Sequence, residues 1–122
     1  MRLAFGLIVA VLATGCSKNS DVEAFIKAND TLAAEIKEKA DKEGPEAARK
    51  AFDAKKEDLK TRYADIKNAR GFQVSAENRK SLGESVSKSS LAICGLQLKV
   101  IMDREKSKAY DGICKEYSGT FK

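Results

Sequence analysis

The chain has 122 residues, which is enough for one small domain and too few for a second core of ordinary size. Charged residues make up 34% of the chain, above the usual fraction of about a quarter, and the formal net charge is +5. Because histidine is absent, the chain cannot form a Ser-His-Asp or Cys-His catalytic pair, nor a His-ligated zinc or haem site. We therefore expect a non-enzymatic protein with no cofactor and no metal site.

The first fifteen residues have the pattern of a secretory signal peptide. Arg2 precedes an apolar run from Leu3 to Ala13, and the small pair Thr14-Gly15 closes this run before Cys16. Residues 3–15 are too few for a membrane-spanning helix, which needs roughly 20 residues. A buried N-terminal helix would need a polar face, which this stretch lacks. The pattern therefore predicts export followed by cleavage.

The end of this segment, Leu12-Ala13-Thr14-Gly15-Cys16, resembles the lipobox of bacterial lipoproteins, with Ala13 where a leucine usually stands. The resemblance implies that a diacylglyceryl group is joined to the Cys16 thiol, that the peptide is cut before this residue, and that the new amino terminus is acylated. Two or three acyl chains hold a soluble domain on a bilayer, whereas one chain is marginal. Ser17, in place of an aspartate after the cysteine, implies the outer membrane, with the periplasmic or surface face left open. The alternative is a secreted protein with an incidental cysteine.

The two remaining cysteines, Cys94 and Cys114, are expected to pair in an oxidising compartment. On one continuous helix, their separation would be about 30 Å, whereas a disulfide requires Cα atoms about 4.4–6.8 Å apart. A bridge therefore requires a chain reversal between them. The charged segment 103–107, with Ser107 as a helix N-cap, predicts a helical hairpin that turns there, and Gly95 would let the two backbones approach. Two buried, unpaired thiols are the alternative.

Apolar residues recur at spacings of three and four over four stretches, about 21–43, 45–70, 75–103 and 107–118. Asp21 is the predicted N-cap of the first stretch, and Gly44-Pro45 separates the first from the second. Strand-like alternation is absent. We therefore expect an all-α fold, a small antiparallel helical bundle of three long helices plus a short C-terminal helix. The predicted organisation is a signal peptide at 1–15, a lipidated cysteine and short tether at 16–20, and a helical bundle domain at 21–122.

The apolar stripes of these stretches define a predicted core. Its members are Val22, Phe25, Ile26, Leu32, Ala33, Ile36 and Ala40; Ala48, Ala51, Phe52, Leu59, Tyr63, Ile66 and Ala69; Leu82, Val86, Ile93, Leu96, Val100 and Ile101; and Ala109, Tyr110, Ile113, Cys114 and Tyr117.

Two short motifs each allow a structural and a functional interpretation. In "ARGFQVS", residues 69–75, Gly71 fits a left-handed helix end with Phe72 folded back on Ile66, or the stretch is an exposed recognition loop bearing Arg70 and Phe72. In "SLGESVSKSS", residues 81–90, the glycine and serines predict a bend or tight packing. A nucleophilic serine paired with Lys88 is disfavoured there, because such spacing is common in a helix rich in Ser and Lys.

The main functional hypothesis is a membrane-anchored envelope lipoprotein that acts through contacts with an unidentified envelope protein. Residues 17–20 form a tether of at most about 13 Å, which would keep the bundle close to the bilayer. One alternative is an inhibitor or immunity-type lipoprotein that blocks a hydrolase or toxin. Another is a periplasmic carrier of an apolar ligand held between the helices. Interspersed acids and predicted export argue against a nucleic-acid partner.

Overall fold

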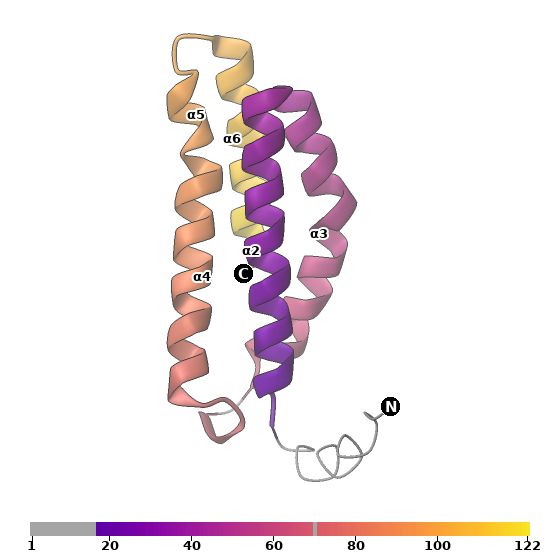
Figure 1. The fold of residues 1–122 in the computed structure, drawn as a ribbon, viewed down its shortest axis with the longest axis vertical. Coiled ribbons are helices and arrows are strands. Elements are labelled where there is room, and N and C mark those ends of the chain that lie inside the picture. Colours follow the sequence, from indigo (N-terminus) through magenta and orange to yellow (C-terminus); the bar gives the residue numbers. More distant parts are fainter. Residues whose placement is uncertain (1–16, 70) are drawn as a thin grey trace.

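The computed structural model describes residues 17–69 and 71–122, which form an all-α bundle (Figure 1). Its main helices are α2 (Asn19–Lys42), α3 (Pro45–Lys67), α4 (Ala76–Cys94) and α6 (Arg104–Gly119). A short 3₁₀ helix, η2 (Gly71–Gln73), precedes α4, and a single turn, α5 (Leu96–Lys99), follows it. No strand occurs in these two ranges, so the predicted fold class is confirmed. The predicted signal peptide and Cys16 lie outside the described residues.

The helices form two antiparallel hairpins that lie side by side (Figure 1). α2 and α3 make the first hairpin, and α4, α5 and α6 make the second. α2 contacts α4 through hydrogen bonds such as that from Asn29 to Ser89. α3 contacts α6 through the ion pair of Arg49 with Glu116. Four helices thus surround one core, and their directions alternate along the chain as the sequence predicted.

The core contains most of the predicted apolar stripes, and the stripes of α2 and α3 are buried or half-buried throughout. Burial of these side chains is the main favourable contribution to folding. At the C-terminal end of α6, four aromatic rings form a cluster with centroid distances between 5.0 and 6.0 Å. Those rings belong to Phe25, Tyr63, Tyr117 and Phe121. The C-terminal residues therefore complete the core where α6 is too short to reach.

The start of α2 differs from the sequence prediction, whereas the break that follows α2 agrees with it. The N–H of Val22 donates to the Lys18 carbonyl at 2.9 Å, so helical bonding begins a turn earlier than expected and Asp21 is not the N-cap. Only Ser17 and Lys18 then separate Cys16 from the helix. At the other end Gly44 has φ of 101°, in a region that side chains rarely adopt, and Pro45 begins α3 as predicted.

The turn after α3 differs from the predicted helix cap. α3 ends at Lys67, and Gly71 begins η2 without a positive φ. Phe72 is 76% exposed, so it does not close over Ile66, and the capping interpretation is wrong. The physical reason is a contact from α4, because the guanidinium of Arg79 donates to the carbonyls of Gly71 and Val74 at 2.8 Å each and sets the turn. Phe72 is exposed as the recognition-loop alternative requires, whereas position 70 lies outside the described residues.

The predicted third helix is interrupted near its end. α4 stops at Cys94, α5 ends at Lys99, and the chain reverses over residues 100–103. Asp103 is the N-cap of α6, since its carboxylate accepts from the Lys106 N–H at 3.1 Å, so the assignment of Ser107 as N-cap was wrong. Ile101 was expected in the core but is 64% exposed. The prediction placed it on the apolar face of a helix that continues to residue 103, but the helix ends before it.

Two glycines of the second hairpin give a matched pair of tests. A Cβ on Gly95 would lie 2.6 Å from the Leu91 carbonyl oxygen, so the close approach is to its own preceding turn, whereas a Cβ on Gly83 meets nothing within 4 Å. Gly95→Ala should lower the free energy of unfolding by about 1–2 kcal/mol. Gly83→Ala should raise it by about 0.4–1 kcal/mol, because alanine favours the helix interior. Urea denaturation measures both, and a stabilising effect at both positions would contradict the tight turn at Gly95.

Candidate functional site

Cys94 and Cys114 face each other across the second hairpin. Their sulfur atoms are 2.03 Å apart and their Cα atoms 4.8 Å apart. The predicted pairing across a chain reversal is therefore confirmed in geometry. The cross-link joins the end of α4 to the middle of α6, so it fixes α5 and the loop 100–103 that lie between them.

A buried asparagine connects three helices. Asn29 of α2 is 0% exposed, and its amide nitrogen donates to the hydroxyls of Ser85 and Ser89 of α4 at 3.0 Å each. Its amide oxygen accepts from the hydroxyl of Tyr117 in α6 at 2.6 Å. We call these four residues the Asn29 hub. The sequence analysis missed Asn29, although it lies four residues after Phe25 on the apolar stripe of α2.

The buried position of the Asn29 hub changes the pKa of the Tyr117 phenol. Burial raises the pKa of Tyr117, and its hydrogen-bonding contacts with Ser89 and Asn29 oppose this effect only in part. The folded state therefore disfavours the phenolate more than the unfolded state does. The resulting stabilisation is fully present below the ordinary tyrosine pKa of about 10 and is lost as the pH rises through the higher folded-state pKa.

The serine-rich stretch 81–90 is continuous helix that packs tightly. Ser85 is buried in the Asn29 hub, and its hydroxyl donates to the Asp30 carboxylate at 2.6 Å. Lys88 is exposed, whereas the hydroxyl of Ser85 is hydrogen-bonded to Asn29 and Asp30 of α2. Across residues 17–69 and 71–122, no group of three or more Cys, Asp and Glu side chains could hold a metal ion. Ser85 and Ser89 therefore hold α4 against α2.

Four large apolar side chains are exposed on the second hairpin, and we call them the distal patch. Leu91 lies in the last turn of α4 and Leu98 in α5, and Ile101 and Met102 follow in the loop before α6. Figure 1 shows α5 and the following loop at the end of the bundle away from the start of α2. Clustered exposed apolar groups mark interaction sites more often than isolated ones do. The exposed fractions are 77% for Leu91, 69% for Leu98, 64% for Ile101 and 96% for Met102.

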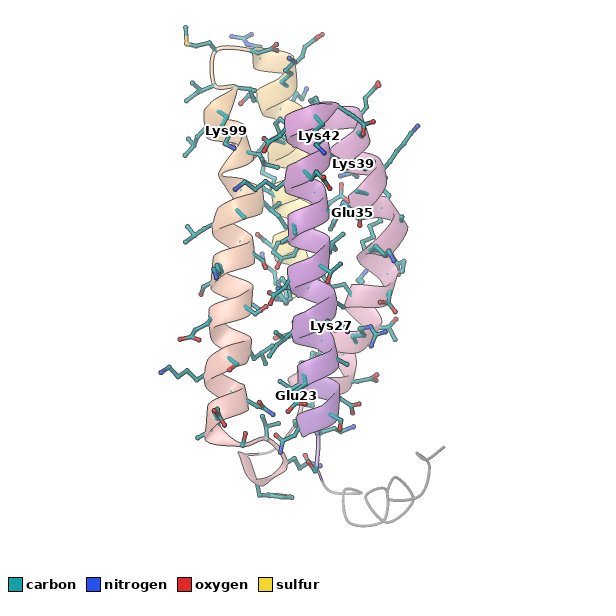
Figure 2. All side chains as sticks on the ribbon, in the orientation of Figure 1. Glu23, Lys27, Glu35, Lys39, Lys42 and Lys99 are labelled. Atoms are coloured by element: carbon teal, nitrogen blue, oxygen red, sulfur yellow. A yellow bond between two sulfur atoms is a disulfide. The ribbon has the colours of Figure 1, made fainter. Side chains whose placement is uncertain are left out.

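Charged residues surround the distal patch. Lys99, labelled in Figure 2, pairs with Asp41 at 3.6 Å and joins α5 to the end of α2. The N-cap and first turn of α6 add three basic and two acidic side chains, all exposed. These are Asp103, Arg104, Glu105, Lys106 and Lys108. An apolar centre with a polar margin has the composition of a protein interface.

The grooves elsewhere on the bundle are open and largely charged. One, of about 370 Å³, lies between α2 and α3 and includes Lys27 and Glu35, which Figure 2 shows on the outward face of α2. Another, of about 640 Å³, lies between α3 and α6 and includes Arg49 and Glu116. The Arg49 guanidinium, with help from Lys56, holds the pKa of the Glu116 carboxyl below its ordinary value. Charged and apolar side chains are mixed in the walls of both grooves, whereas the distal patch is made of apolar side chains alone.

No protein-family model matches the chain, and neither curated proteins nor solved structures give a match. Among the helices in the described ranges, none combines the length and apolar character needed to cross a membrane.

Proposed function

We propose that this protein is a non-enzymatic lipoprotein of the bacterial outer membrane, anchored through a lipid on Cys16 and acting through its distal patch on another envelope protein. The distal patch carries the proposal, because binding of a partner that removes four exposed apolar side chains from water lowers the free energy of the complex. Carboxylates at the margin of that partner would complement the basic start of α6 and favour association in one orientation.

The position of the patch suits a protein attached at its N-terminus. α2 has 24 residues, and a helix of this length extends about 36 Å. Cys16 is separated from α2 by Ser17 and Lys18 alone. An anchor there would therefore put the distal patch at the far end of the bundle, up to about one helix length from the bilayer.

A photoreactive amino acid at Met102 tests the contact in living cells. The side chain of Met102 is 96% exposed, so the replacement should leave folding unchanged. We expect one discrete cross-linked product that disappears when Leu98→Glu is added, because a charge at the patch would have to be desolvated in the interface. Thermal unfolding should show a change within about 0.5 kcal/mol for Leu98→Glu.

The matched control is the same photoreactive amino acid at Ala54, an exposed residue of α3. It should give no product, and Ala54→Glu should leave the cross-link at position 102 intact. A product at position 102 that survives Leu98→Glu would contradict the role of the patch. A hydrolase or toxin as the cross-linked protein would favour the inhibitor alternative, and bound lipid without any partner would favour the carrier.

The anchor is tested separately by metabolic labelling with palmitate. The wild-type chain should be labelled and Cys16→Ala should not, because this substitution removes the thiol that the lipobox resemblance assigns to the lipid. Equal labelling of the two chains would contradict the anchor. Fractionation of the labelled protein should place it in the outer membrane, and Ser17→Asp should move it toward the inner membrane.

A further inference from the structure

The turn that carries Phe72 lies at the start of the described chain. The N–H of Lys18 donates to the Gln73 carbonyl at 2.7 Å. The side-chain oxygen of Asn19 accepts from the N–H of Ser75 at 2.9 Å. η2 and the beginning of α2 therefore occupy the same end of the bundle, as Figure 1 shows.

The exposure of Phe72 is fixed by the surrounding structure. Arg79 holds the carbonyls on both sides of the turn, those of Gly71 and Val74, at 2.8 Å each. Val74 is only 6% exposed and attaches the turn to the core, whereas Phe72 is 76% exposed. A large aromatic ring is thus presented outward on a turn that is tied to both α2 and α4.

Covalent geometry places this ring near the predicted lipid. Cys16 is two residues from Lys18, a separation of at most about 7 Å. Phe72 precedes Gln73, which is hydrogen-bonded to Lys18, so the Phe72 and Cys16 Cα atoms lie within about 20 Å of each other. The headgroup region on each side of a bilayer is about 5–8 Å thick. Acyl chains on Cys16 would therefore keep η2 near the surface of the bilayer, within reach of the headgroup region.

We propose that Phe72 inserts into the membrane interface beside the lipid anchor and gives the bundle a second point of contact with the bilayer. This inference rests on the proposed lipidation of Cys16. Aromatic rings favour the boundary between headgroups and acyl chains. Two contacts at one end keep the bundle upright and hold the distal patch away from the bilayer, where a single flexible attachment would let it lie on its side.

The test uses the absence of tryptophan from the chain, so that one introduced tryptophan is the only such reporter. The full lipidated chain carrying Phe72→Trp is reconstituted into vesicles of phosphatidylethanolamine and phosphatidylglycerol, with and without brominated acyl chains. We expect the emission of the tryptophan to shift to shorter wavelength and to be quenched by the brominated lipid. Met102→Trp and Leu91→Trp, at comparably exposed positions, should show neither effect.

The outcomes separate the inference from the proposed function. Vesicle flotation and intact mass report the anchor independently of the tryptophan signal. A lipidated chain that floats with the vesicles, but whose tryptophan at position 72 is no more quenched than that at position 102, would overturn the insertion and leave the anchor intact. A chain that carries no lipid would overturn both. Cross-linking from position 72 to a protein, without quenching, would assign the ring to a protein contact and also overturn the insertion.

Discussion

Replacement of both Cys94 and Cys114 by alanine is expected to lower the free energy of unfolding by about 3 kcal/mol. The two residues are 20 positions apart, and their cross-link limits the freedom of the unfolded chain most strongly over that segment. For a domain of this size the loss corresponds to a decrease of about 12–24 °C in the melting temperature. Differential scanning calorimetry of the bundle, residues 17–122, measures it directly.

Chemical reduction is the control for this double substitution. Reduced wild-type protein should melt near the temperature of the double variant, and a reductant should not change the melting of the variant itself. The loop that carries Ile101 and Met102 lies between the two cysteines of the disulfide. Reduction of the disulfide before irradiation should therefore also lower the yield of the photo-cross-linked product at position 102. Identical melting of the oxidised and reduced wild type would show that the bond contributes nothing to stability.

The parts of the fold that could be predicted depend on neighbouring residues in the sequence. The spacing of apolar residues predicted the helices, because a helix brings every third and fourth residue to one face. The break at Gly44-Pro45 was also local, since it depends on a glycine conformation and on the proline ring. These features need no knowledge of what lies across the bundle.

The features that could not be predicted are set by distant contacts. Gly71 and Phe72 resemble a helix cap, but Arg79 of α4 shapes their turn instead. Ile101 continued the apolar spacing, yet the helix ended before it and exposed it. The distal patch followed from that ending, so the sequence pattern alone could not reveal it.

The Asn29 hub falls between these two cases. A polar residue on the apolar stripe of α2 and serines at the buried spacing of α4 are visible in the sequence. Their partners come from different helices, and only the three-dimensional arrangement shows that each polar group finds one. The sequence signal was therefore a gap in the apolar pattern, and its meaning required the fold.

Asn29→Ala is expected to lower the free energy of unfolding by about 2–3 kcal/mol, because it leaves the buried Tyr117 hydroxyl without its acceptor. Tyr117→Phe should cost about 1–2 kcal/mol, since it leaves the amide oxygen of Asn29 unpaired. The double variant should lose less than the sum of the two by at least about 0.5 kcal/mol, because each single substitution already breaks the shared hydrogen bond. Urea denaturation of the three variants and the wild type measures this coupling.

Tyr63→Phe is the matched control, because it deletes the same hydroxyl from a half-buried ring that packs on Phe25 and Phe121 outside the hub. Its effect should stay within about 0.5 kcal/mol. The pH dependence adds a second measurement, since the raised pKa of Tyr117 makes the wild type lose stability above about pH 10. Tyr117→Phe should reduce that alkaline loss, and the remainder comes from other groups with a raised pKa, such as Tyr110. Strict additivity of the single effects together with an unchanged alkaline profile would show that the hydroxyl does not link α6 to α2.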